Sequence, residues 1–390
     1  MSKTSAPSND RPPSKCDVVV LGGGPAGTAA ALTLARAGRS VIVVEKSHYD
    51  EPRIGETLSP SARVALAELG VWQTFLSAAH SPAPGVASSW GEDGLHETHF
   101  IFNAHGRGWH LERHRFDAML AQAARDRGAR VHCGTRVLSC VRHSDLWQVE
   151  LTTGDDDCGS HNVRPRFVID ATGRAATVAR QQGAKRFPLD RLVGLAAVLP
   201  HRSANGVPAG DVDLGSEATA WTLVEACADG WWYSVLLPSR RWMAVYMTDA
   251  DLLPRGREAW RAFWQSRLQQ TMHTRARLGA LDDNVVPRVV PAGTSRLDRV
   301  SGNGWLAVGD AAMARDPLSG QGLVQALDSG IRAGGALNRV LNGDAAAIAQ
   351  YAGQTAALFY EYSRLRAVHY GREQRWPQSI FWKRRQLAAA

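Results

Sequence analysis

Two acidic side chains occupy positions from which a proton could be passed to a bound ligand. Glu56 stands in the loop 52–60, whose glycine and prolines prevent regular structure. Asp316 directly precedes a glycine-bounded turn at 317–322. Either carboxyl could act as a general acid or base. Glu56 could equally cap the helix predicted to begin at Ser61, and Asp316 could do no more than fix its turn.

Aromatic side chains form the second candidate group. Trp231, Trp232 and Tyr233 are consecutive in a predicted strand, where they could form the walls of a pocket for an aromatic substrate. Strand aromatics more often pack in the core, so both interpretations stand. The five cysteines are scattered without a C-x-x-C, a pattern typical of reduced thiols in a cytosolic protein. Neither a metal site nor a catalytic triad is expected.

The elements that must position these groups begin with a glycine-rich stretch. A short apolar run at 16–21 predicts a buried parallel strand. A G-x-G-x-x-G at 22–27 follows it and opens a helix predicted over 29–37. A second strand, 40–44, ends on Glu45. Strand, glycine turn, helix, strand and acidic residue in this order predict a dinucleotide-binding unit.

Each residue of that unit has a physical role. Gly22 permits the tight turn, Gly24 lets a pyrophosphate approach the backbone, and Gly27 lets helix and strand pack closely. Backbone amides and the helix dipole then hold the phosphates. Glu45 is placed to accept a ribose hydroxyl, and an acidic residue there disfavours a 2′-phosphate. The ligand is therefore FAD or NAD rather than NADP.

A second strand–glycine–helix site lies far along the chain. The run at 304–310 predicts a buried strand that ends on Gly309 and Asp310, and a long helix is predicted from about Gly322. Asp310 could bind the ribityl hydroxyls of a flavin, while the helix dipole faces the flavin ring. Simple NAD dehydrogenases need no such second site, so the pair of sites favours FAD.

These motifs resemble those of FAD-dependent monooxygenases of the aromatic hydroxylase and halogenase superfamily. The resemblance rests on the segments 22–27, 55–57, 113–117, 170–173, 309–310 and 317–322. It implies an α/β fold with a Rossmann-like FAD-binding domain, of the aromatic hydroxylase or glutathione reductase type, interleaved with an antiparallel-sheet substrate domain. The cofactor-binding residues expected from motifs and resemblance together are Gly22, Gly24, Pro25, Ala26, Gly27, Glu45, Lys46, Arg53, Arg113, Asp170, Gly173, Gly309, Asp310, Pro317, Gly320, Gln321 and Gly322.

Departures from that superfamily argue against halogenation. Flavin halogenases carry hypohalous acid on a lysine shortly after the Gly-Glu loop, but this chain has no lysine between Lys46 and Lys185, and Ala83 stands in the best-matching segment. The halogenase W-x-W-x-I-P element is replaced by the related but different run 231–238. The sequence at 170–173 also departs from the Asp-Gly motif of hydroxylases that use NAD(P)H directly. The electron donor therefore stays open between NAD(P)H and a separate flavin reductase.

A narrower resemblance comes from 55–58, 230–234, 246–249 and the tail 372–385. These segments are similar to flavoprotein maturases encoded beside quinone-containing lysine and glycine oxidases. The resemblance implies hydroxylation of a tryptophan in an oxidase precursor, on the way to cysteine tryptophylquinone. Two alternatives remain: an FAD-dependent hydroxylase or oxidoreductase acting on a small aromatic natural product, and a non-catalytic FAD-binding chaperone of the precursor.

Charge and domain organisation complete the prediction. Of the net charge of +8, +5 falls at 361–390, where Trp376 and Trp382 are interleaved with arginines. This segment could dock an acidic partner, or it could be a helix with aromatics packed and charges solvated. No aromatic-basic nucleic-acid module and no membrane-spanning run is visible, and a cytoplasmic protein is expected.

The sequence predicts four parts. They are a disordered leader at 1–15, an FAD-binding domain at 16–80, 109–190 and 285–345, a substrate domain at 81–108 and 191–284, and a C-terminal helical basic segment at 346–390.

Overall fold

The larger of two main sheets forms one half of the protein. The structure, a computed structural model, describes residues 14–153, 160–201, 220–279 and 285–386. Within them this sheet has eight strands. Five run parallel, in the spatial order β20 (Trp305–Ala307), β11 (Ser160–Asp170), β1 (Ser14–Leu21), β2 (Val41–Val44) and β8 (Arg130–His132). Three join antiparallel: β19 (Ser301–Gly302) beside β20, and β10 (Leu146–Thr153) with β9 (Thr135–His143) beside β11.

The strand register brings the candidate site residues to one edge of this sheet. Leu21 at the end of β1 pairs with Asp170 at the end of β11, and Asp170 pairs with Ala307 at the end of β20. In open α/β sheets ligands bind beyond the carboxyl ends of the strands. Both glycine motifs follow these ends directly.

Two long helices pack against each other beside the sheet. These are α1 (Pro25–Arg36) and α8 (Gly322–Leu341). Glycines of α8 permit the close approach, since a Cβ at Gly334 would lie 2.8 Å from Cβ of Thr33 and 2.9 Å from the carbonyl oxygen of Ala30. The remaining helices of this half are α2 (Ala62–Glu68), α3 (Trp72–Leu76), α4 (Arg113–Asp126) and α5 (Thr177–Gln181).

The second main sheet is almost entirely antiparallel. Its seven strands follow the order β17 (Arg288–Pro291), β13 (Leu192–Pro200), β16 (Arg241–Asp249), β15 (Gly230–Leu236), β14 (Thr222–Cys227), β5 (Gly85–Ser89) and β6 (His96–His99). Six of them come from 81–108 and 191–284, the stretches that the sequence assigns to a substrate domain, whereas β17 falls in 285–345, which it assigns to the FAD-binding domain. Strands β14, β15 and β16 pair antiparallel, in agreement with the expected antiparallel-sheet character. Helices α6 (Arg257–Gln269) and α7 (His273–Leu278) cover one face.

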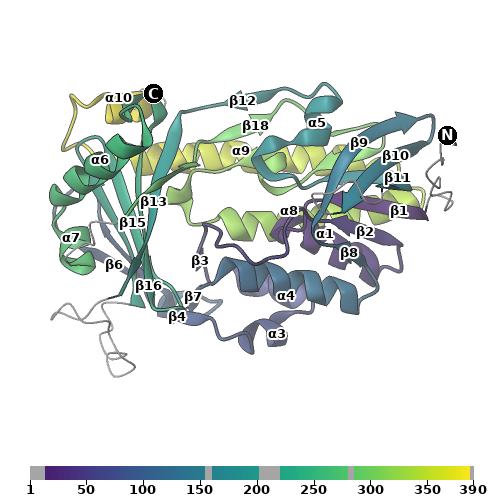
Figure 1. The fold of residues 1–390 in the computed structure, drawn as a ribbon, viewed down its shortest axis with the longest axis horizontal. Coiled ribbons are helices and arrows are strands. Elements are labelled where there is room, and N and C mark those ends of the chain that lie inside the picture. Colours follow the sequence, from purple (N-terminus) through teal and green to yellow (C-terminus); the bar gives the residue numbers. More distant parts are fainter. Residues whose placement is uncertain (1–13, 154–159, 202–219, 280–284, 387–390) are drawn as a thin grey trace, which may run out of the picture.

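The C-terminal helices connect the two halves. Figure 1 shows the seven-stranded sheet at the left, the eight-stranded sheet at the right, and α9 (Ala347–Gly371) running lengthwise from one half toward the other. The last helix, α10 (Ile380–Gln386), packs on the seven-stranded sheet through Phe381 and Trp382. Two three-stranded sheets complete the fold: β12 (Arg186–Pro188) with β18 (Ser295–Leu297) and β21 (Met313–Ala314), and β3 (Thr57–Leu58) with β7 (Gly108–His110) and β4 (Ser81–Ala83).

The α/β fold class is confirmed, and some local expectations change. The helix predicted from residue 29 begins at Pro25, because proline is well suited to the first turn of a helix. The apolar run Phe100–Phe102 forms a 3-10 turn. Strand β1 begins at Ser14, inside the predicted leader, whose first thirteen residues lie outside the described part. No helix in the described ranges is long and apolar enough to span a membrane.

Candidate active site

The first glycine motif leaves space for a ligand at the start of α1. Gly22 has a φ of +109°, and a Cβ there would collide with the backbone of Ala171. A Cβ at Gly27 would collide with the carbonyl oxygen of Gly22. At Gly24, the residue before α1, a Cβ would meet no protein atom within 4 Å. The cradle is therefore closed on the protein side and open where a pyrophosphate would approach, which fits a dinucleotide cofactor.

The second glycine motif converges on the first. A Cβ at Gly309 would lie 2.8 Å from Cβ of Ala26 in α1. The amide of Gly309 donates to Ser329 Oγ of α8 at 2.8 Å, which fixes the turn. The Asp310 side chain remains 41 % exposed. The two sites that the sequence predicts to share one extended cofactor therefore meet in space.

Charged side chains pair with one another beside the first glycine motif. Glu45 accepts the amide of Gly23 at 2.7 Å and pairs with Arg53 at 2.9 Å. Burial alone would raise the pKa of Glu45, but hydrogen bonds from Ser47 and Gly23 and the charge of Arg53 outweigh it and lower that pKa. Glu45 is therefore ionised, and both of its oxygens accept from protein groups, so its contact with a ribose hydroxyl stays a prediction.

Arg113, predicted to contact the cofactor, belongs to the same group of paired charges. Arg53 and Arg113 both pair with the buried carboxylate of Asp117, at 3.1 and 3.2 Å. Arg113 also donates to the carbonyl of Ile54 at 2.5 Å and so anchors the loop that carries Glu56. Asp117 was not singled out in the sequence, although its place one turn after Arg113 on a helix was a usable signal.

Not every predicted cofactor residue faces the cradle. Asp170 is fully buried, and its carboxylate accepts from Thr172 and from the amide of Ala179. It therefore holds the loop before α5 instead of reaching a ligand, which corrects its predicted role. Gly173 has open space around its Cα, with a φ of +65°, and Lys46 is exposed beside Glu45.

The turn predicted to face the flavin ring leads into α8. Gly320 has a φ of +59°, and a Cβ at Gly320 or Gly322 would meet no protein atom within 4 Å. The turn, Pro317–Ser319, precedes Gln321, which occupies the position before the first residue of α8. Open space therefore lies at a second helix N-terminus, as required for a ligand with partial negative charge.

Asp316 takes the structural role that the sequence allowed. One carboxylate oxygen accepts the amide of Leu318 at 3.0 Å, and the other accepts from Arg366 and Tyr370 at 3.2 and 2.8 Å. With both oxygens occupied and the side chain 1 % exposed, Asp316 holds the Pro317 turn to α9. The geometry does not support its candidate role as a catalytic acid or base.

Glu56 is the titratable group that best fits a role in proton transfer. It is fully buried, and burial raises the pKa of its carboxyl to about 7. Its Oε2 accepts from the hydroxyl of Tyr233 at 3.3 Å, while Oε1 is buried without a hydrogen-bond partner. A buried carboxyl with such a pKa can hold or release a proton near neutral pH.

A chain of hydroxyl groups supports Glu56 and Tyr233. Thr57 Oγ1 lies 3.1 Å from the Tyr233 hydroxyl and 3.1 Å from Thr222 Oγ1, which in turn lies 3.1 Å from Nε2 of His110. Burial lowers the pKa of His110 to about 3, so its ring is neutral at physiological pH. This network joins the loop that carries Glu56 to the seven-stranded sheet and fixes the carboxyl of Glu56.

The three aromatic residues predicted to line a pocket lie on two different faces of the sheet, because successive side chains of a strand point in opposite directions. Trp231 and Tyr233 lie on the sheet face toward the Glu56 loop, and Trp231 donates to the hydroxyl of Tyr370 at 3.1 Å. Trp232 points to the opposite face and packs against Trp264 beneath α6. Trp232 is therefore a core residue, and its predicted contact with substrate is wrong. Trp231 is only 1 % exposed and belongs to the buried cluster against which Tyr233 packs.

Half-buried apolar side chains pack against the same buried cluster as Tyr233. They include Ile54 from the loop, Leu318 from the turn, Trp90, Val224 and Val290. These side chains come from both halves of the molecule and retain partial exposure. Apolar walls with one titratable group are suited to an aromatic ring and to the exclusion of water.

Four of the seven cations in the C-terminal segment 361–390 are paired with carboxylates of the protein. Arg366 pairs with Asp190 and Asp316, Arg375 with Glu373 and Asp93, and Arg384 and Arg385 with Asp249, all within 3.2 Å. Trp382 is fully buried and stacks on Trp376. The interpretation as a helix packed on the protein therefore holds for these residues, and they do not form a free docking patch.

Arg385 gives a direct test of this correction. Arg385→Met should lower the free energy of unfolding by about 3 kcal/mol, because it removes one partner of a buried ion pair. The guanidinium lies 2.7 Å from Oδ1 of Asp249, and both side chains are 2 % exposed. Lys383→Met, two residues away and exposed, should change stability by no more than about 0.5 kcal/mol. Equal midpoints of chemical unfolding for the two variants would contradict the buried pair.

The comparisons with known proteins agree with this architecture. The model of a family described as an FAD binding domain matches residues 15–357. LodB of Marinomonas mediterranea, described as an FAD-dependent oxidoreductase, is 29 % identical over 381 residues, which cover 96 % of this chain and 98 % of LodB.

Two solved structures are also similar over most of the chain. The flavin-dependent halogenase CmlS superposes with a TM-score of 0.82 at 25 % identity, covering 95 % of this chain and 68 % of CmlS. The peptidyl tryptophan dihydroxylase QhpG, essential for tryptophylquinone cofactor biogenesis, gives a TM-score of 0.76 at 28 % identity, covering 96 % of this chain and 79 % of QhpG.

Proposed function

Because the chain belongs to the FAD binding domain family of flavin-dependent monooxygenases, with FAD as its cofactor, we propose that it hydroxylates a tryptophan side chain of a partner protein. The partner is the precursor of a quinone-containing amino-acid oxidase, and the product is an intermediate of cysteine tryptophylquinone formation. The leading alternative is a hydroxylase or oxidoreductase acting on a small aromatic natural product.

The observation that carries this proposal is the similarity to QhpG, named for peptidyl tryptophan dihydroxylation, at 28 % identity over 96 % of this chain. The similarity to LodB, described as an FAD-dependent oxidoreductase, covers 98 % of LodB, whereas the CmlS halogenase extends well beyond the matched region.

The residues of the site divide the chemical work. FAD, once bound and reduced, activates molecular oxygen and supplies the oxygen atom. The apolar side chains around Ile54 and Leu318 exclude water and orient an electron-rich indole. Glu56 holds a proton close to the reacting centre, and Tyr233 keeps its carboxyl in place. No metal-binding cluster is found among the described residues.

The same site argues against halogen transfer. The segment in which a halogenase carries its lysine corresponds best to Ala83, which is buried in β4. No lysine stands between Lys46 and Lys185, so an amine that could carry hypohalous acid is missing from that region. The structural similarity to halogenases therefore supports a shared fold and oxygen chemistry more than a shared product.

Co-expression tests the proposed function. When this protein is produced with a tryptophylquinone-type lysine or glycine oxidase precursor, one precursor tryptophan should gain mass in steps of about 16 Da, one for each inserted oxygen. With bromide in excess, the same residue should still gain oxygen and no halogen. Peptide mapping by mass spectrometry reads out both results. If the tryptophan is processed equally in cells that lack this protein, or gains halogen instead, the proposal fails.

A non-catalytic chaperone is separated by the same experiment. Such a protein would raise the yield of folded precursor without oxygenating the tryptophan.

Adding a flavin reductase with NADH to the purified pair identifies the electron source. Oxygenation that needs the reductase indicates a two-component system, and oxygenation with NADH alone indicates direct reduction.

A further inference from the structure

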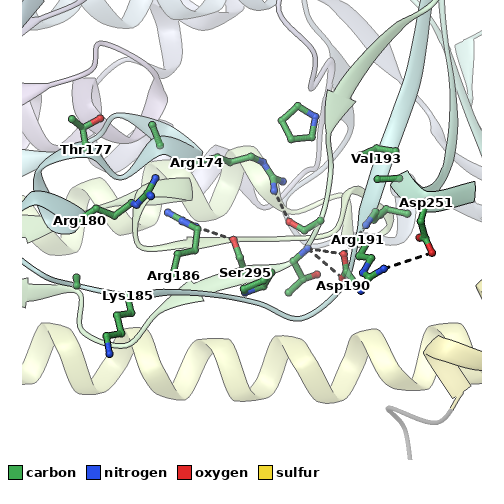
Figure 2. Close-up of a pocket in the computed structure, with 18 of the residues that line it drawn as sticks. Arg174, Thr177, Arg180, Lys185, Arg186, Asp190, Arg191, Val193, Asp251 and Ser295 are labelled. Atoms are coloured by element: carbon green, nitrogen blue, oxygen red, sulfur yellow. Dashed lines mark hydrogen bonds and ion pairs between the residues drawn. The ribbon is translucent and has the colours of Figure 1, made fainter. Parts of the chain in front are cut away.

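A long basic groove lies between the two halves of the molecule, outside the site described above. It runs from α5 and β12 to the start of β13, with a volume of about 1510 Å³ (Figure 2). Five cationic side chains line it: Arg174, Arg180, Lys185, Arg186 and Arg191. Two acidic side chains also line it, but Asp190 is paired with Arg366 and Asp251 with Arg384, each at 2.7 Å. The groove therefore carries excess positive charge.

Arg174 pairs with Asp310 at 3.5 Å and Arg191 with Asp251 at 3.6 Å, but the other three groove cations have no ion pair among the described residues. Of these three, Arg180 and Lys185 are exposed. Arg186 donates to Ser295 Oγ at 2.8 Å and to the carbonyl of Ala311 at 2.8 Å, while its Nε is buried without a partner. Burial lowers the pKa of Arg186; repulsion from Arg174 and Arg180 acts in the same direction, and attraction to Asp310 opposes it. Half-buried arginines that repel one another favour a bound anionic group.

The size and lining of the groove favour a polypeptide over other anions. Its volume exceeds the 300–1,000 Å³ of ordinary small-molecule pockets. No aromatic side chain lines it, so it lacks the stacking platforms by which proteins hold single-stranded nucleic acids. Phe187 and Leu189, on the same short segment as Arg186, are 48 % and 47 % exposed. Cations beside exposed apolar side chains suit an acidic segment that also carries apolar residues.

The groove borders the second glycine motif. Arg174, which lines the groove, lies 3.5 Å from the carboxylate of Asp310, the predicted ribityl contact. A chain lying in the groove would therefore pass directly beside the site that holds the flavin.

We propose that this groove docks an acidic segment of the protein whose tryptophan is hydroxylated. The inference rests on the proposed function and names the surface that the partner uses. Long-range attraction by the groove cations would speed encounter at low salt, and contact with Arg180 and Lys185 would hold the segment while the tryptophan enters the site. In this proposal the partner docks on the cations of 174–191, and not on the C-terminal arginines from which the sequence predicted docking.

Charge reversal in the groove tests the proposal. The double variant Arg180→Glu/Lys185→Glu is compared with Arg255→Glu/Arg257→Glu, which reverses two exposed arginines at the start of α6. Binding of a fluorescein-labelled oligoglutamate peptide is followed by anisotropy, and precursor oxygenation by mass spectrometry. The groove variant should bind the peptide about tenfold more weakly and oxygenate the precursor with a raised KM and an unchanged kcat. FAD content should match the wild type.

The outcomes separate this proposal from the proposed function. If the wild type oxygenates the precursor and both double variants behave alike, the groove proposal is wrong and the proposed function stands. If the wild type leaves the precursor tryptophan unmodified, the proposed function fails and the groove proposal fails with it. Tighter binding of a single-stranded oligonucleotide than of the peptide would overturn the groove proposal in favour of a nucleic acid. Loss of FAD from the groove variant would assign these cations to the cofactor instead.

Discussion

Gly24→Val abolishes FAD binding and leaves the protein folded: this is the result we expect from the geometry of the first glycine motif. A Cβ at Gly24 meets no protein atom within 4 Å, so the valine side chain projects into the space over the start of α1. That space is where a pyrophosphate must approach the backbone. Purified variant should be colourless and should take up no FAD in an equilibrium titration that saturates the wild type.

Thermal unfolding separates a lost ligand from a lost fold. FAD at 100 times its Kd should stabilise the wild type by about 2.7 kcal/mol, and it should not stabilise the variant. Without FAD the two proteins should unfold at the same temperature. Gly27→Val provides the contrast, since its Cβ collides with the carbonyl oxygen of Gly22, and it should fail to fold with or without FAD. A yellow Gly24→Val protein would refute the cofactor site.

Glu56→Gln is expected to reduce kcat for tryptophan oxygenation by about 10²- to 10⁴-fold, the usual loss when a positioned acid or base is removed. Glutamine preserves the shape of the side chain and accepts the Tyr233 hydrogen bond, but it cannot supply the proton. FAD content and KM for the precursor should change little. A variant with wild-type kcat would show that Glu56 is only structural.

The pH dependence of kcat distinguishes a general acid from a general base at Glu56. Burial raises the pKa of Glu56 from an ordinary 4.5 to about 7, so the carboxyl is protonated below pH 7 and ionised above it. As a general acid it should give a kcat that falls as the pH rises through 7, and Glu56→Gln should remove that limb. A kcat that rises through pH 7 would instead assign Glu56 as a base.

The same shift affects stability. Between pH 4.5 and 7 the folded state holds a proton on Glu56 that the unfolded state releases, so this group's contribution to stability falls as the pH rises through that window. Tyr233→Phe removes a hydrogen bond that favours the ionised carboxylate. The falling limb of kcat in that variant should therefore move to higher pH.

The C-terminal segment and the aromatic strand show where sequence reasoning stopped. Arginines spaced with tryptophans are compatible with a docking patch, but Arg384 and Arg385 face Asp249, which lies far away in the sequence. Trp231 and Trp232 are equivalent by type, and only the assignment of each strand face distinguishes a residue beneath the site from one in the core. Both distinctions depend on partners brought together by the fold.

What the sequence determined by itself was local or periodic. The G-x-G-x-x-G turn, the acidic end of β2 and the strand that ends on Asp310 were readable because a tight turn, a close backbone approach and a buried strand each demand particular residue types within a short stretch. Only the tertiary structure decided which of the two candidate carboxyls, Glu56 or Asp316, keeps an oxygen without a hydrogen-bond partner. Asp316 meets Arg366 and Tyr370 of α9, whereas Glu56 is buried with one unpartnered oxygen. The physical reason is that burial and pairing, which set the pKa of a carboxyl, depend on contacts between distant parts of the chain.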